Sequence, residues 1–377
     1  MTPIYFDNAA TTPLAPQVIE EMLPYLTQHF GNPSSIHTFG RTTRSAIEKA
    51  RKTVANILNI SPSEIFFTSC ASEADNQAII AGTNALHCQH IITSKIEHHA
   101  VLHAVDHLKK TQNTTVSYLQ TDAKGHIDLL ELDQLLQQHP KAFVSLMHGN
   151  NEIGNLNDIA TIAQICQSHQ AYFHSDTVQT VGHYRHDLQA IKADFIVGSA
   201  HKFHGPKGVG FIYVKGAHKI DPYIHGGSQE RNMRGGTENV AGIVGLAKAL
   251  ELAYEGMDQH RSQIASLKTY MIGQLKSFIP GVQFNGDCEN EATSLYTVLS
   301  VSLPNSEDND MLLMNLDINK IAASGGSACT SGATESSHVI EAIGGDSTRT
   351  TVRFSFSRYN TLAEVDYVVN VLKKYYH

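Results

Sequence analysis

Short apolar segments alternate with amphipathic ones from about residue 64 to residue 214, and this alternation predicts repeated strand–helix units. The expected strands lie at 65–67, 91–93, 115–119, 142–147, 172–173, 195–197 and 209–214. The expected helices lie at 71–81, 97–110, 129–138 and 158–169. Units of this kind form a mainly parallel sheet with helices on both faces, and ligands then bind at the carboxyl ends of the strands.

The pattern changes beyond about residue 258, where a helix at 259–278 leads into strands at 296–301, 321–322 and 352–355 and a closing helix at 364–374. We therefore predict a large domain over residues 15–258. Residues 1–14 and 259–377 would form a smaller α/β domain. No repeat, low-complexity tract or long linker separates the two, so we expect them to pack closely.

The composition of the chain argues against a nucleic-acid-binding protein and against a membrane-spanning one. The net charge of −8 argues against a nucleic-acid surface, because phosphate binding needs a concentrated basic face. No apolar run reaches the roughly 18 residues of a membrane helix, and the first residues lack a secretory signal, so we expect a cytoplasmic protein. The five cysteines are odd in number and form no Cys-x-x-Cys pair, which predicts reduced thiols.

Two residues near strand ends suggest a cofactor. Lys202 lies in a segment of small and turn-forming residues, 198–208, and is either a solvated loop lysine or the partner of an aldehyde in a Schiff base. Asp176 is either a helix cap or the acid that keeps the pyridine nitrogen of pyridoxal phosphate protonated, so that the ring works as an electron sink. Because both residues follow strands, the fold would bring them to one crevice, and together they favour the cofactor.

A phosphate group needs its own site, and the segment 68–73 lies between an expected strand and helix. Free backbone N–H groups at Ala71 and Ser72, together with the helix dipole, would attract an anion there. Ser199 and His201 could add contacts from the lysine segment. The alternative is an ordinary capping box, with Ser69 or Ser72 as the cap.

Cys329 lies within a run of small residues that begins at Ser324, and we expect a mobile loop over about 324–335. Free cysteine is normally a buried small hydrophobe, whereas an exposed thiolate is available as a nucleophile. The other cysteines are interpreted as packing residues or unreactive surface thiols.

His99, His103 and His107 recur on one helix face with a spacing that could bind a transition metal. A solvated polar face explains the same spacing, and we favour that explanation. No metal is therefore predicted.

Motifs from residue 5 to beyond residue 350 carry a family resemblance. They lie at 5–12, 31–35, 97–98, 150–154, 174–179, 198–208, 234–237, 327–331 and 353–355. In these segments the chain resembles the group I cysteine desulfurases of the class-V aminotransferase family, the branch that serves nitrogen fixation and iron–sulfur-cluster assembly. The resemblance implies a fold-type I pyridoxal-phosphate enzyme, with a mainly parallel seven-stranded sheet in the large domain and a smaller α/β domain.

The resemblance also implies roles at the cofactor. Lys202 would hold pyridoxal phosphate and later shuttle a proton, and Asp176 would pair with the pyridine nitrogen. Gln179 would bond the phenolic oxygen, and His98 would stack on the ring and assist in acid–base steps. Further implied cofactor contacts are Ala71, Ser72, Asn151, Ser199, Ala200, His201 and Thr237, the last from the second subunit of a homodimer.

For the substrate, the resemblance implies that Arg353 clamps the carboxylate of L-cysteine, with help from Asn151 and Asn32. Cys329 would take the sulfur as a persulfide, leave L-alanine, and pass the sulfur to an acceptor protein such as an iron–sulfur scaffold. One departure is that the phosphate segment reads Cys70-Ala71-Ser72, where the family often has Gly-Ala-Thr.

Other functions stay open from the sequence. A selenocysteine lyase or another class-V transaminase would use the same scaffold. A sulfur-relay subunit without catalysis would keep the fold alone, but the presence of Lys202, Asp176, His98 and Cys329 favours an active enzyme.

Overall fold

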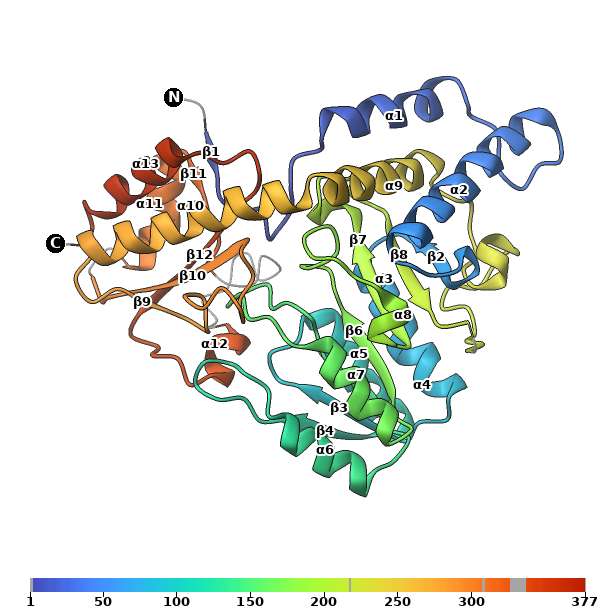
Figure 1. The fold of residues 1–377 in the computed structure, drawn as a ribbon, viewed down its shortest axis with the longest axis horizontal. Coiled ribbons are helices and arrows are strands. Elements are labelled where there is room, and N and C mark those ends of the chain that lie inside the picture. Colours follow the sequence, from blue (N-terminus) through green and yellow to red (C-terminus); the bar gives the residue numbers. More distant parts are fainter. Residues whose placement is uncertain (1–2, 217, 307–308, 326–336, 377) are drawn as a thin grey trace.

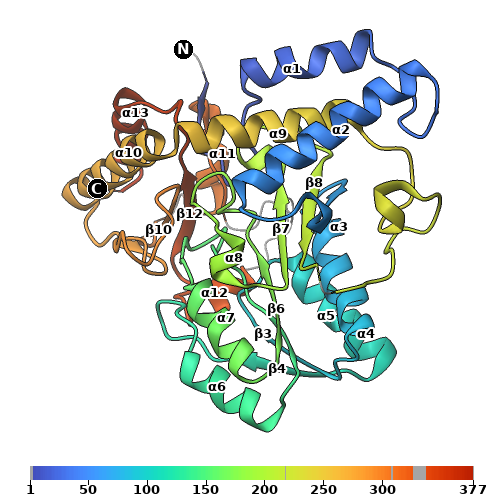
Figure 2. The same ribbon diagram turned by 45° about the vertical axis from the view of Figure 1, so that its right-hand side comes forward.

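The computed structural model describes residues 3–216, 218–306, 309–325 and 337–376. Its centre is a seven-stranded sheet (Figures 1 and 2). In spatial order the strands are β2 (Ile65–Thr68), β8 (Gly210–Val214), β7 (Phe195–Ser199), β6 (Tyr172–Asp176), β5 (Phe143–Ser145), β3 (His90–Ser94) and β4 (Thr115–Leu119). All neighbours are parallel except β8, which is antiparallel to both β2 and β7. The mainly parallel seven-stranded sheet predicted from the sequence is confirmed.

Helices cover both faces of this sheet, which explains why five of its strands are buried along their whole length. One face packs on α1 (Pro16–Thr27), α2 (Thr38–Ile57), α6 (Leu129–Gln138), α7 (Ile159–Ser168), α8 (Leu188–Ile191) and α9 (Val240–Glu255). The other face packs on α3 (Ala71–Asn76), a π-helical turn (Gln77–Ala81), α4 (Gly82–Ala85) and α5 (His99–Gln112). Short 3-10 turns at Pro62–Glu64, Ala200–Lys202, Gln229–Asn232 and Asn309–Met311 connect longer elements.

A second region has its own sheets and its own hydrophobic core. Antiparallel strands β12 (Thr350–Ser355), β10 (Val298–Leu303) and β9 (Gln283–Phe284) form one sheet, and β1 (Ile4–Tyr5) pairs in parallel with β11 (Ile321–Ala322). Its helices are α10 (Met257–Phe278), α11 (Leu312–Ile318), α12 (His338–Ala342) and α13 (Leu362–Leu372). The chain therefore begins inside this region and then crosses to the large sheet (Figure 1). Within the described residues, no helix is both long and apolar enough to cross a membrane.

The expected elements and the observed ones agree closely where the apolar pattern is strongly periodic, as at β4 and α6. Helices α1, α2 and α9 were not predicted from the sequence. Helix α9 is buried on most sides, so its polar face is narrow and its sequence lacks the strong amphipathic pattern that identifies a surface helix. Helix α1 contains Pro24, a residue that normally indicates a helix end.

A buried ion pair ties the segment before α9 to the large sheet. Arg51 of α2 is fully buried and donates two hydrogen bonds, of 2.7 and 2.8 Å, to the carboxylate of Glu230. The same carboxylate accepts a bond from the backbone N–H of Phe67, and Arg51 also donates to the carbonyl oxygen of Ile65. The Arg51–Glu230 ion pair therefore joins strand β2, helix α2 and the 229–232 turn.

We predict that Arg51→Met lowers the free energy of unfolding by about 3 to 5 kcal/mol, because it leaves the Glu230 carboxylate buried without its counter-ion. Arg185→Met is the matched control, since Arg185 forms an exposed pair with Asp258, and it should change stability by about 1 kcal/mol or less. Urea denaturation followed by circular dichroism measures both. Equal losses in the two variants would contradict the prediction.

Candidate active site

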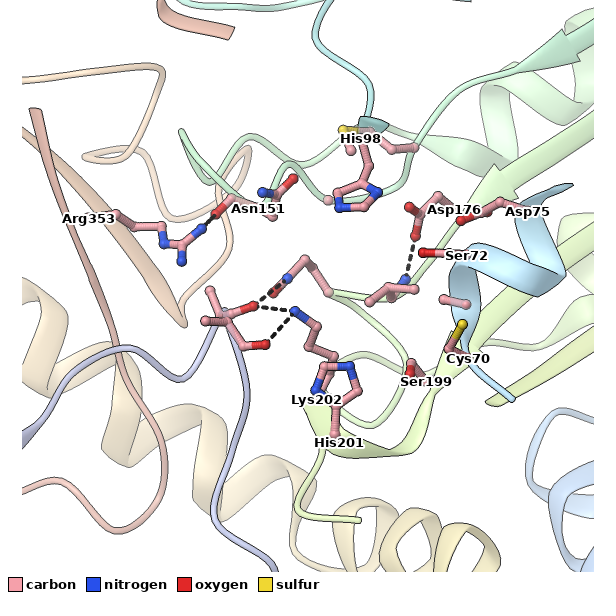
Figure 3. Close-up of a pocket in the computed structure, with 17 residues that line it drawn as sticks. Cys70, Ser72, Asp75, His98, Asn151, Asp176, Ser199, His201, Lys202 and Arg353 are labelled. Atoms are coloured by element: carbon pink, nitrogen blue, oxygen red, sulfur yellow. Dashed lines mark hydrogen bonds between the residues drawn. The ribbon is translucent and has the colours of Figure 1, made fainter. Parts of the chain in front are cut away.

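A cavity of about 210 Å³ opens where the strands of the large sheet end. Its lining comes from the β2–α3 turn, the start of α5, and the residues that follow β5, β6 and β7 (Figure 3). Strand β12 and the N-terminal residues Ala9 and Ala10 close it from the second region. The cavity is thus at the carboxyl edge of the sheet, where parallel α/β folds place their ligands.

Asp176 marks one end of this cavity. It is the last residue of β6 and is 6% exposed, and its Oδ1 accepts a hydrogen bond of 2.9 Å from the backbone N–H of Val178. That bond fixes the carboxylate toward the cavity. Burial raises the pKa of Asp176, and the nearby His98 ring, the N–H of Val178 and the Lys202 amine oppose the rise.

Further acidic groups lie behind Asp176. Asp75 of α3 lines the cavity, is 1% exposed, and neither of its carboxylate oxygens has a hydrogen-bond partner among the described residues. Burial raises its pKa well above the usual range, and the charges of Asp176 and Glu97 raise it further. The ring Nε2 of His174 lies 3.3 Å from Asp75, but burial lowers the pKa of His174 to about 3, so this imidazole is neutral. This end of the cavity is therefore suited to a cationic group that donates a hydrogen bond.

Lys202 enters the cavity from the 3-10 turn after β7. Its Nζ donates to the carbonyl oxygens of Ala9 and Ala10, the second at 3.0 Å. The turn itself is held in place by Thr12, whose N–H and hydroxyl both donate to the carbonyl oxygen of His201 at 2.9 Å. The N-terminal segment thus sets where the lysine amine lies.

Hydroxyl and imidazole groups gather beside the start of α3. Ser72, Ser199 and His201 all line the cavity near the helix end at which N–H groups lack intrahelical partners (Figure 3). The turn before the helix is fixed by Glu73, which accepts bonds from the N–H and hydroxyl of Ser69 and is paired with Arg234 at 2.9 Å. Donors of this kind at a helix N-terminus fit a phosphate group.

His98 and Lys202 lie on opposite sides of the cavity (Figure 3). Burial lowers the pKa of His98, although Asp176 opposes the shift, so the ring is neutral at pH 7. Its Nδ1 accepts a 3.1 Å bond from the N–H of Ala100, which fixes the ring as the cap of α5. Gln179 lines the same cavity and donates to the carbonyl oxygen of Ala9 at 3.1 Å.

Arg353 of β12 lies at the end of the cavity opposite Asp176 (Figure 3). Its guanidinium donates to the carbonyl oxygen of Asn151 at 2.8 Å and pairs with Asp7 at 3.0 Å, and its buried Nε has no partner among the described residues. Donors therefore remain for an anionic ligand.

These residues fit pyridoxal phosphate. The buried acids around Asp176 suit a protonated pyridine nitrogen, Lys202 can hold the aldehyde carbon, and the donors at α3 suit the phosphate. The unpartnered carboxylate of Asp75 is the clearest sign that a polar group belongs there, because buried polar atoms are normally hydrogen-bonded.

The structure brings together most of the predicted site residues, but not all of them. Ala200, the first residue of the turn that carries Lys202, is buried and does not line the cavity. Asn32 is exposed, and its side chain accepts a hydrogen bond from the N–H of Ser34. Thr237 lines a separate hollow with Arg234 and Glu238. Cys329 and the loop around it fall outside the described residues, apart from Ser324 and Gly325.

Three contributions to the site were not predicted from the sequence. Asp75 lies two residues after the phosphate segment, so its place on α3 was the available signal. The carbonyl groups of Ala9 and Ala10 leave no side-chain signal at all. Asp7 falls within the recognised 5–12 motif, but its pairing with Arg353 spans almost the whole chain.

The histidines at 99, 103 and 107 do not build a metal site. No group of three or more His, Cys, Asp or Glu side chains in the described part of the chain could hold a metal ion. His99 instead has its ring 5.2 Å from that of His103 and 4.5 Å from that of His338.

Comparisons with known proteins agree with this geometry. The family model described as "Aminotransferase class-V" matches residues 4–368. A protein of Clostridium botulinum named cysteine desulfurase IscS is 42% identical, over 98% of this chain and 94% of its own length. A solved NifS-like protein is 36% identical with a TM-score of 0.91, and the match covers 99% of both chains. The structure titled "SspA in complex with cysteine" is 32% identical with a TM-score of 0.81, covering 95% of this chain and 100% of that one.

These matches confirm the family that the sequence motifs indicate. They extend over nearly the whole chain and include both the large sheet and the second region. The chain belongs to the class-V aminotransferase family of pyridoxal-phosphate enzymes, within the branch whose members are named cysteine desulfurases.

Proposed function

We propose that this chain is a cysteine desulfurase, which converts L-cysteine to L-alanine and transfers the sulfur to Cys329 as a persulfide. The observation that carries the proposal is the cavity itself, with an amine, a buried acid and a guanidinium at separate places around one space. The cysteine bound to the SspA relative supports the choice of substrate.

The cofactor would be held by groups at both ends of the cavity. Asp176 would accept a hydrogen bond from the pyridine nitrogen, and Ser72, Ser199 and His201 would donate to the phosphate. Neutral His98 would lie against the ring face. Bound pyridoxal phosphate supplies an electron sink that acidifies the Cα–H bond of the substrate.

Arg353 would bind the substrate carboxylate through charge-assisted hydrogen bonds, beside Asn151. Lys202 would take the proton from Cα and hold it on Nζ for return to carbon. The thiolate of Cys329 would attack the substrate sulfur, so that an S–S bond forms while the Cβ–S bond breaks and leaves its electron pair on carbon. Protonation of Cβ and return of the proton from Lys202 to Cα would complete L-alanine, and the net transfer is one sulfur atom.

The next acceptor would be a separate sulfur-carrying protein, such as an iron–sulfur scaffold. We place the enzyme in the cytoplasm, where Cys70, Cys88, Cys166 and Cys288 would stay reduced, as they are in the structure. A selenocysteine lyase is the rival function, since it would use the same groups.

We also propose a homodimer. Large apolar side chains are exposed on α1, on α2 and on the segment between them, and exposed apolar surface of this extent is typical of an interface. They are Ile19, Leu23, Leu26, Phe30, Ile36 and Phe39. Asn32 and Thr237 lie outside the cavity of their own chain, and they would reach a cavity from the second copy.

The purified protein should show the visible absorption of bound pyridoxal phosphate, and with L-cysteine and a reductant it should release sulfide and L-alanine in equal amounts. Cys329→Ala should keep the colour and lose sulfide release, because the sulfur then has no acceptor. Cys70→Ala, which removes the thiol of the cavity lining, should retain sulfide release. If only the Cys70 variant lost sulfide release, Cys70 would be the nucleophile instead of Cys329. If the protein turned over selenocysteine but not cysteine, the selenocysteine lyase would be favoured.

Asp176→Asn should lower the rate of alanine formation by about a hundredfold or more, because an amide no longer stabilises the protonated ring nitrogen. Steady-state assays with saturating cofactor measure the change. Asp133→Asn is the control, since Asp133 is exposed and bonded to His169 away from the cavity. An Asp176→Asn variant that forms alanine at a near-normal rate would contradict this role of Asp176.

Phe30→Asp should convert the dimer into monomers, because a charge would be buried at the apolar interface. Light scattering with size-exclusion chromatography measures the mass. Ile318→Asp changes a similarly exposed side chain on α11 and should leave the dimer intact. A wild-type protein that is monomeric at micromolar concentration would contradict the proposal.

A further inference from the structure

Arg353 has an internal counter-ion. Its side chain is 1% exposed, and its Nη2 lies 3.0 Å from Oδ1 of Asp7. Among the described residues, its guanidinium also donates to the carbonyl oxygen of Asn151, which carries no net charge. Asp7 is therefore the charged group that balances the guanidinium.

Asp7 is itself held in position by the second region. Its Oδ1 also accepts a 2.7 Å hydrogen bond from the hydroxyl of Ser324. The backbones of Ser324 and Arg353 exchange two hydrogen bonds, and Asp7 forms a backbone bridge with Ser355. Three distant segments of the chain thus fix this one carboxylate beside the guanidinium.

Asp7 does not line the cavity, so it would not touch a ligand there and would act on it through Arg353 and through its own charge. Asp7 would weaken the binding of a carboxylate at Arg353 in two ways. Asp7 already satisfies part of the guanidinium, which lowers the gain from a second anion, and its own negative charge repels that anion. Removal of Asp7 would leave Arg353 buried with an unbalanced charge, and such a charge favours any carboxylate that can reach it.

We propose that Asp7 is a positioning residue that weakens the binding of α-carboxylate ligands at Arg353, so that L-alanine leaves after each turnover. The inference rests on the proposed function, in which Arg353 binds the substrate carboxylate. It adds that Asp7 keeps the carboxylate-binding group, Arg353, nearly neutral overall and so limits its affinity for carboxylates. Release of product is often the slow step of an enzyme, so a clamp that binds too tightly would limit the rate.

The test uses the holoenzyme with Cys329→Ala, so that no sulfur transfer occurs, and titrates it with L-alanine and with L-alaninamide. Changes in the absorption of the bound cofactor give both dissociation constants. With Asp7→Asn added, L-alanine should bind roughly tenfold more tightly, while L-alaninamide, which has no carboxylate, should bind as before. The unfolding midpoint should fall, because Arg353 has lost its counter-ion.

Tighter binding in a less stable protein separates this proposal from simple damage, which would weaken both ligands. Ser324→Ala is the matched control: it removes the hydroxyl donor to the same oxygen without changing the charge, and it should leave the ratio of the two constants unchanged. If Asp7→Asn does not fold, Asp7→Ser gives the same comparison.

The inference would be overturned if the Asp7 variant bound L-alanine more weakly, or if its ratio of the dissociation constants for L-alanine and L-alaninamide were unchanged. A Ser324→Ala effect as large as that of Asp7→Asn would also overturn it. Because the titration needs no thiol, either result would leave the desulfurase proposal standing. Failure of the wild-type protein to release sulfide would instead count against the desulfurase activity alone.

Discussion

The N-terminal segment that crosses between the two regions is the constraint on which the site depends. Its carbonyl groups at Ala9 and Ala10 receive the Lys202 amine, and Asp7, two residues earlier, pairs with Arg353. One extended stretch therefore sets the separation between the group that would hold the cofactor and the group that would bind the substrate. A shift of this segment would move both ends of the active site at once.

Charge is distributed unevenly around the cavity, and this distribution explains its chemistry. Asp75 and Asp176 are buried at one end with neutral His174 beside them, whereas Arg353 occupies the other end with Asp7 behind it. The buried carboxyl groups at the acidic end favour a protonated ring nitrogen. At the basic end, Asp7 already balances the charge of Arg353. Under the proposed function, the acidic end would retain the cofactor, and the basic end would bind and release the substrate carboxylate.

Much of the fold and the site could be predicted from local signals. Strand β4 and helix α6 have strong periodicity, and the residues just after β6 and β7 were chosen because strand ends meet at one edge of a parallel sheet. Helix α9 escaped because burial on most sides removes its amphipathic pattern. Asp75 was not predicted because its place on α3 is only a weak signal, and its significance depends on which side chains surround it.

The sequence by itself determined the family, the cofactor and the residue types at the centre of the site, because motifs and strand ends are local properties of the chain. Only the tertiary structure decided that Asp7 balances Arg353, since residues so far apart meet through the pairing of sheets. It also decided that Asn32 and Thr237 lie outside the cavity of their own chain. The physical reason is that backbone preferences act over a few residues, whereas burial and charge pairing depend on the whole packed molecule.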